Sequence, residues 1–259
     1  MGTEPTLADA VLAATITMLA TGLGALPFVF VRRFPDNLAR LGWAFAGGIM
    51  LSASVFNLII PGVNQGGVPP VALGVMVGTA IIGLASMYLT RHEHDERGIP
   101  IPTPGVQGGT RVVLIMGTMF LHSFPEGLAV GVAYGSGAAA LGVLVAVAIA
   151  IHNIPEGVAV ALPLREAGVS GWKSVGWAIF SSLPQPIAAI PAFLAVKIFE
   201  PFLPFAFGLA AGAMFFVVLS EMIPESRAND AERLTSALAT MVGFLFLMGL
   251  TSLLLLPGS

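Results

Sequence analysis

The 259-residue sequence contains no cysteine and few charged residues. Without cysteine there can be no disulfide, thiolate metal site, thiol redox chemistry or cysteine nucleophile. Charged residues make up 10% of the chain, whereas a soluble domain carries roughly 25%. The chain therefore lacks the polar surface that a water-soluble globule needs. Its 11 Lys and Arg, set against 14 Asp and Glu, form no basic patch, so nucleic-acid binding has no electrostatic support.

Several functional motifs are also missing. The sequence has no P-loop or other nucleotide motif, so we expect no direct use of ATP. The H-E-x-x-H helix of many zinc hydrolases is absent. The first basic residue is Arg32, so the positive region that opens a cleavable signal peptide is not present.

The chain contains long hydrophobic stretches. Hydrophobic residues make up 56% of it, and the mean hydropathy is +0.91. This composition predicts an all-α, multi-pass membrane protein, with residues 1–259 forming a single transmembrane domain. About eight stretches are long enough to cross ~30 Å of hydrocarbon at about 1.5 Å per residue. They are residues 7–31, 38–60, 69–90, 111–134, 139–164, 172–197, 202–222 and 234–256.

The basic residues predict the orientation of these spans. Ten of the 11 Lys and Arg lie in the connections that follow the first, third, fifth and seventh spans, and only Lys197 lies elsewhere. Short cytoplasmic connections are enriched in Lys and Arg. We therefore expect both termini on the extracytoplasmic side of the cell (inner or plasma) membrane, which requires an even number of spans and agrees with eight.

One cytoplasmic connection, at about residues 91–110, has its own chemistry. It contains the run His92-Glu93-His94-Asp95-Glu96, followed by a proline-rich segment. Such a segment is typical of an extended, solvated loop. Alternatively, His92 and His94 form a weak, exposed site that captures metal ions.

A polar motif, H-x-x-P-E-G, occurs twice inside the apolar spans. It runs from His122 to Gly127 and again, 30 residues later, from His152 to Gly157. His and Glu four positions apart share one helix face, and each ionisable group inside a span costs on the order of 2.5–3.5 kcal/mol. The motif proline should kink each helix and release a backbone carbonyl, and the glycine lets a neighbouring helix approach closely.

The two motifs should lie at the same depth. The fourth and fifth spans are antiparallel with a very short connection, and each motif lies a similar distance from it. A single buried His–Glu pair is most often a polar contact between helices, but two copies at matched depth favour a binding site. Two carboxylates neutralise a dication and two neutral imidazoles supply nitrogen, a ligand set that suits Zn²⁺ and similar divalent ions.

At these residues the chain resembles the ZIP (Zrt/Irt-like protein) family of divalent-metal transporters, most closely its bacterial branch. The resemblance extends over the whole chain and implies an inverted 3+2+3 arrangement, with the fourth and fifth helices central and the site near the midplane. It implies that the primary metal ligands are His122, Glu126, His152 and Glu156, with Asn153 beside them.

Two positions depart from the pattern of two-metal members of the family. Ser123 stands where the family often has Asn, and Gln185 stands where those members carry a carboxylate. We therefore predict one strong metal site and a weak or absent second site. The resemblance also points to Met50, near the site on the second helix.

Further polar residues are candidates for the transport path. Asn57 lies near the outer end of the second span, and Glu221 lies at the cytoplasmic end of the seventh. Glu225 is more typical of a solvated loop, and Ser54 is suggestive only.

The leading hypothesis is uptake of a divalent cation, zinc above all, from outside into the cytoplasm, with iron, manganese, cobalt and cadmium as other possible metals. The alternatives are a passive metal-selective channel and, with less support, an intramembrane metal hydrolase. The expected partners are divalent metal ions and the lipid bilayer. Small residues at 208–212 permit tight packing within one chain or between the copies of a homodimer.

Overall fold

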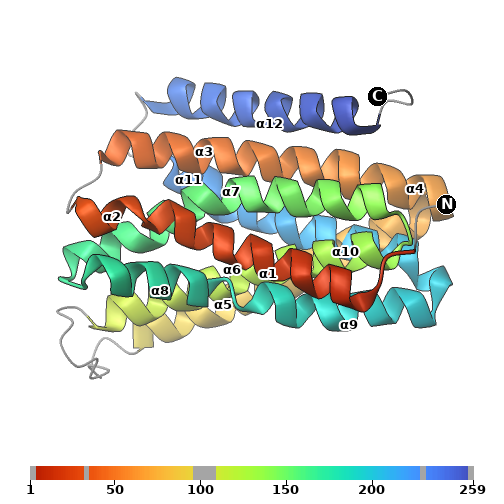
Figure 1. The fold of residues 1–259 in the computed structure, drawn as a ribbon, viewed down its shortest axis with the longest axis horizontal. Coiled ribbons are helices and arrows are strands. Elements are labelled where there is room, and N and C mark those ends of the chain that lie inside the picture. The colour runs from red at the N-terminus through yellow and green to blue at the C-terminus, as the bar shows by residue number, and fades with distance from the viewer. Residues whose placement is uncertain (1–3, 32–34, 96–108, 228–231, 256–259) are drawn as a thin grey trace.

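The structure is a computed structural model that describes residues 4–31, 35–95, 109–227 and 232–255. These residues are mostly helical and contain no strand, which confirms the all-α prediction (Figure 1). The helices in chain order are α1 (Leu7–Ala25), α2 (Pro27–Phe30), α3 (Asp36–Ser52), the π-helix η1 (Ala53–Ile59), α4 (Ile60–Gly66), α5 (Val68–Asp95), α6 (Gly109–Gly135), α7 (Ala139–Glu166), α8 (Gly171–Ser181), α9 (Pro184–Ile198), the 3-10 helix η2 (Glu200–Phe202), α10 (Leu203–Val217), the π-helix η3 (Val218–Met222), α11 (Ile223–Glu225) and α12 (Arg233–Leu255).

Local chemistry determines where several helices begin and end. α1 starts at Leu7 because Thr6 and Asp9 form a reciprocal capping box. The predicted break between the fourth and fifth spans is confirmed: α6 ends at Gly135 and α7 begins at Ala139. Gly137 turns the chain there with a φ of 84°, a conformation that favours glycine.

Seven stretches within the described residues are long and apolar enough to cross a membrane. They correspond to the first, second, third, fifth, sixth, seventh and eighth predicted spans. The fourth, α6, is 27 residues long but is not among the seven. The chain is thus a multi-pass membrane protein.

The helices run roughly parallel to one another, and the two ends of the bundle differ (Figure 1). α1 begins and α12 ends at the same end of the bundle, on the right in Figure 1. The helix ends that lead from α2 to α3, from α5 to α6 and from α11 to α12 lie at the opposite end. These are the connections in which the sequence concentrates its arginines.

α6 and α7, called the central pair below, contact helices from both halves of the chain. α6 packs against α7 and most extensively against α9, with further contacts to α10 and α1, and α7 packs most extensively against α1, with further contacts to α3 and α8. Farther out, α5 packs along α10 and α12 packs along α3. The predicted small-residue face is used within the chain, since a Cβ added at Gly208 or Gly212 would lie 2.2 or 2.1 Å from a backbone carbonyl oxygen of α5.

Four spans are interrupted in ways that the hydropathy pattern did not predict. The first span breaks between α1 and α2, just before Pro27. The sixth span breaks between α8 and α9, just before Pro184. The second and seventh spans widen into π-helices, and each π-helix ends two residues before a proline, Pro61 or Pro224. A proline ring clashes with the carbonyl four residues earlier, and a widened turn relieves that clash. π-Bulges of this kind are frequent at functional sites.

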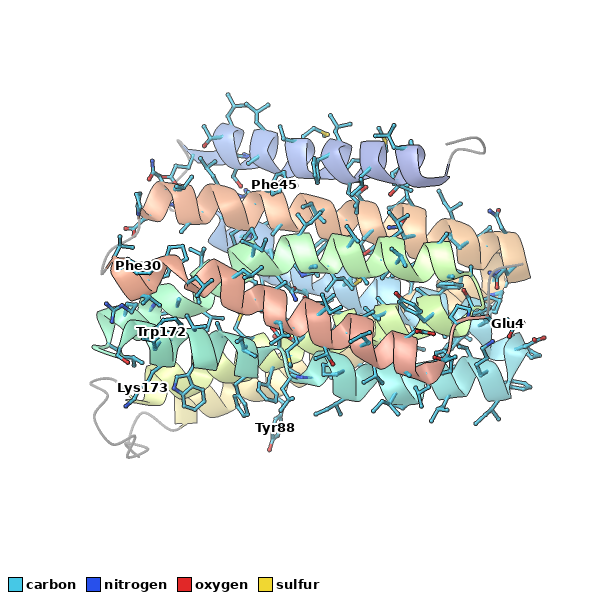
Figure 2. All side chains as sticks on the ribbon, in the orientation of Figure 1. Glu4, Phe30, Phe45, Tyr88, Trp172 and Lys173 are labelled. Atoms are coloured by element: carbon cyan, nitrogen blue, oxygen red, sulfur yellow. The ribbon has the colours of Figure 1, made fainter. Side chains whose placement is uncertain are left out.

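The outer surface suits a lipid environment. Large apolar side chains project from the bundle, and Figure 2 shows Tyr88 pointing away from it. Trp172 and Lys173 lie together in the first turn of α8, at one end of the bundle (Figure 2), and aromatic and basic side chains are typical of the membrane–water boundary. His92 and His94, the candidate metal-capturing residues, fall in the last turns of α5, and their side chains lie outside the described residues.

Candidate metal site

The two motifs lie on α6 and α7, and each helix runs without interruption through its motif proline. The motif glycines mark the closest helix contacts. A Cβ added at Gly157 would lie 1.8 Å from the carbonyl oxygen of Thr21 on α1, and one at Gly127 would lie 2.3 Å from that of Gln185 on α9. The predicted close approach at these glycines is thus confirmed. It brings α1 and α9 against the central pair at the level of the motifs.

Three of the four predicted ligands meet between α6 and α7. One ligand atom from each of Glu126, His152 and Glu156 lies within 4.8 Å of the others. The His152 Nε2 atom is 2.8 Å from Glu126 Oε1, and all three side chains are at most 2% exposed. One imidazole and two carboxylates at this spacing offer a nitrogen and oxygens to a divalent cation.

Glu156 is the least satisfied member of this group. Both of its carboxylate oxygens are buried and have no hydrogen-bond partner among the described residues. A buried carboxylate without a partner is costly in a low-dielectric interior unless it binds a proton or a cation. Glu156 is therefore suited to a site that takes up a positive charge.

His122, the fourth predicted ligand, faces a different neighbour. Its Nε2 atom lies 3.2 Å from Glu221 Oε2 on η3. Its ring lies 6.2 Å from that of Trp43, measured between centroids. Ser86 on α5 donates a hydrogen bond of 3.2 Å to the other oxygen of Glu221. His122 and Glu221, predicted separately as ligand and path residue, are thus paired beside the three-ligand group.

Gln185 links the two motifs from the first turn of α9. Its Nε2 donates a short hydrogen bond to Glu126 Oε2. Its Oε1 accepts hydrogen bonds from Thr17 Oγ1 at 2.6 Å and from Asn153 Nδ2 at 3.3 Å. Asn153 Nδ2 also donates to the carbonyl of Thr17 at 2.7 Å. The break before Pro184 is what directs this first turn of α9 at the motifs.

The remaining candidates are buried but lie apart from this network. Ser123 Oγ has no hydrogen-bond partner among the described residues. Met50 is 1% exposed, and its carbonyl accepts a hydrogen bond from Ser54. Asn57 accepts a weak hydrogen bond of 3.4 Å from Thr251 on α12. In the part of the chain that the structure describes, no hydrogen bond links these side chains to Glu126, His152 or Glu156.

Besides Ser86 and Thr251, sequence reasoning missed two further residues that contact the predicted ones. Thr17 on α1 forms hydrogen bonds with both Gln185 and Asn153. The ring of Trp43 on α3 lies against that of His122. The available signal for Thr17 was its repetition one turn later as Thr21, since both hydroxyls share a helix face in an apolar span. Thr21 pairs with Ser182 at 2.7 Å, at the break before α9.

The sequence also matches proteins of a known family. Residues 89–251 match the family model described as "ZIP Zinc transporter". The chain is 38% identical over 260 residues to the zinc transporter ZIPB of Bordetella bronchiseptica, covering 95% of this chain and 81% of the relative. It is 34% identical over 233 residues to the zinc transporter GufA of Myxococcus xanthus, covering 85% and 89%.

A plant relative is longer than this chain. The chain is 40% identical over 225 residues to an Arabidopsis thaliana protein that is provisionally named a zinc transporter; the match covers 86% of the chain but 35% of the relative. The ZIP family consists of transporters, so the intramembrane hydrolase is no longer a candidate. By the matched family model and by these relatives, the chain belongs to the ZIP zinc transporter family.

Proposed function

We propose that this protein carries divalent cations, zinc above all, into the cytoplasm through a site between α6 and α7. The observation that carries this proposal is the group of Glu126, His152 and Glu156, whose ligand atoms lie within 4.8 Å of one another in a buried position. Two carboxylates balance the charge of a dication, and the imidazole adds a ligand that zinc favours. The names of the bacterial relatives support zinc as the first metal to test.

The proposed topology has eight spans in an inverted 3+2+3 arrangement. Exchanging the first three spans for the last three, and α6 for α7, maps the helix contacts onto one another. The α1–α7 contact corresponds to α9–α6, α3–α7 to α10–α6, and α3–α12 to α10–α5. The π-helices η1 and η3 fall in equivalent spans, and each precedes a proline. Inverted repeats of this kind are common in transporters with a site at the midplane.

In the proposed orientation, both termini lie on the extracytoplasmic side of the membrane. The arginine-bearing connections, including residues 91–110, lie in the cytoplasm. Because the chain has no cysteine, single cysteines can test this assignment. Ala138→Cys, in the connection between α6 and α7, should react with an impermeant maleimide added to intact cells. Ser170→Cys, before α8, should react only after permeabilisation. The reverse pattern would overturn the proposed orientation.

The path toward the cytoplasm passes the pair of His122 and Glu221. His122 lies one helical turn from Glu126 on the same face of α6, and Glu221 lies near the end of the seventh span where the arginines gather. A cation leaving Glu126 can thus be bound next by His122 and Glu221. Because metal ligation requires deprotonated ligands, zinc binding should weaken as the pH falls.

The proposed site holds one metal ion strongly. Gln185 presents an amide nitrogen to Glu126 and directs its oxygen toward Thr17 and Asn153. It therefore adds no negative charge to compensate a second dication beside the first. Zinc titration of the purified chain should reach one tightly bound ion, and two tight sites would contradict this part of the proposal.

The decisive experiment is uptake of radioactive zinc into proteoliposomes. Wild type should show uptake that saturates with zinc concentration, and Glu156→Gln should abolish it while preserving the size of the side chain. Glu200→Gln, an exposed change in η2, is the matched control and should transport normally. Equal uptake by Glu156→Gln and wild type would overturn the proposed site. Uptake that fails to saturate would favour a passive channel over a carrier.

A further inference from the structure

A pocket of about 330 Å³ lies outside the metal site, between α3, α11 and α12. Its apolar part is formed by Leu51, Ile223, Met241 and Phe244, which come from all three helices. This volume falls at the small end of ligand pockets, which span about 300–1,000 Å³. The pocket can therefore hold a small polar group and the first carbons of an attached chain.

Two arginines give the pocket a positive charge. Arg227 and Arg233 line it, and both are exposed. Among the side chains that the structure describes, which do not include that of Glu225, neither arginine forms an ion pair with a carboxylate. The nearby carboxylate of Glu232 is held by Arg40 through two hydrogen bonds of 2.9 and 3.0 Å. Asp230 belongs to the connection at 228–231, outside the described residues.

The pocket lies where a membrane lipid can reach it. α12 is the outermost helix of the bundle and packs along α3 (Figure 1). Its outer side chains, among them Leu234, Leu238 and Met241, are more than half exposed. Arg227 and Arg233 lie at the end of the bundle where the other arginine-bearing connections gather. The positive charge is thus at headgroup depth, and the apolar wall continues into the hydrocarbon region.

We propose that this pocket binds one anionic phospholipid of the arginine-rich side of the membrane. Guanidinium groups bind phosphate oxygens through paired hydrogen bonds. Basic pockets between membrane helices suit anionic headgroups, with about 1 kcal/mol of attraction per Lys or Arg near an anionic surface. A zwitterionic lipid carries its own cation, which opposes Arg227 and Arg233. The first part of an acyl chain lies against Met241 and Phe244.

The bound lipid would connect the outermost helix to the transport path. Ile223 in the pocket directly follows η3, the segment that contains Glu221. Leu51 lies in α3, one residue from Met50. The site is independent of the proposed metal function, because none of the metal-site side chains lines the pocket.

The test is native mass spectrometry of the full chain in detergent, with phosphatidylglycerol titrated against phosphatidylcholine. Wild type should retain one phosphatidylglycerol with clear preference over phosphatidylcholine. Arg227→Gln and Arg233→Gln should each weaken binding about fivefold, and the double variant about 25-fold. Lys173→Gln removes one exposed charge at the same end of the bundle and should leave binding unchanged.

A second variant separates the pocket from its charge. Ala237→Trp fills the pocket without changing the charge and should also displace phosphatidylglycerol, while circular dichroism checks that helix content is intact. Equal binding of the two lipids would overturn the proposal, as would wild-type binding by the double arginine variant. Glycerol phosphate that binds as tightly as phosphatidylglycerol would mean a site for small anions, which would also overturn the lipid assignment.

Discussion

α6 and α7 carry the same H-x-x-P-E-G motif and pack side by side, yet their histidines have different neighbours. His152 on α7 reaches across to Glu126 on α6. His122 on α6 turns instead toward Glu221 on η3. The motif places a histidine one turn before a glutamate, but the surrounding helices decide what each histidine contacts. Under the proposed function, the repeated motif therefore has two roles, one in the three-ligand group and one on the path toward the cytoplasm.

The contrast between the two histidines predicts the largest effect. His152→Gln should lower zinc affinity by at least about 100-fold, since loss of an outer-shell partner alone costs about 10–100-fold and His152 belongs to the ligand group itself. Isothermal titration of purified protein measures this directly, with Glu200→Gln as the control. A zinc affinity within a fewfold of that of wild type would show that His152 is not a ligand. The proposed difference between His152 and His122 would then be wrong.

Gln185 should have the next largest effect because it touches both motifs. Gln185→Ala removes the donor to Glu126 and the acceptor for Asn153, and zinc affinity should fall about 10-fold or more. Gln185→Glu should instead supply a carboxylate beside Glu126 and allow a second zinc ion to bind. Titration stoichiometry separates the outcomes, and a Gln185→Glu chain that still binds one ion would show that charge is not what limits the site.

His122→Gln should lower zinc affinity less than it lowers the rate of zinc uptake. Because His122 is paired with Glu221 rather than with the ligand group, we expect zinc affinity to fall less than about 10-fold while the rate of uptake falls more. Glu221→Gln should do the same, and the double variant should be no worse than either single one, as expected for residues that act together. If the losses in uptake rate were additive in the double variant, His122 and Glu221 would act independently rather than as a pair.

Much of the fold followed from the sequence because apolar length restricts membrane spans so strongly. The predicted fifth span, 139–164, begins at the first residue of α7 and ends two residues short of its last. What the sequence did not reveal is where spans break. Pro61 and Pro224 follow π-helices, whereas Pro125 and Pro155 lie in uninterrupted α-helices. Proline alone therefore does not determine the local structure; packing against neighbouring helices does.

The site was predictable in its residue types but not in its pairings. Two histidines and two glutamates in a repeated motif indicated shared depth and metal chemistry. The partner of each side chain depends on helices distant in the sequence: Glu221 lies 99 residues after His122, and Thr17 lies 168 residues before Gln185. No local pattern encodes such contacts. The same holds for Trp43, whose ring meets that of His122 only once α3 has packed against the central helices.

A substitution at Thr17 should have the smallest effect, and it tests whether α1 contributes to the metal site through Gln185. Thr17→Val keeps the shape of the side chain and removes its 2.6 Å hydrogen bond to Gln185. One neutral hydrogen bond contributes about 1 kcal/mol, so zinc affinity should fall by about fivefold if Gln185 positions Glu126. Thr21→Val is the control, because it removes a similar side-chain bond, to Ser182, that involves neither Gln185 nor a ligand. Equal effects of the two valines on zinc affinity would mean that α1 acts on stability alone. An effect confined to Thr17→Val would extend the metal site to a helix that carries none of its ligands.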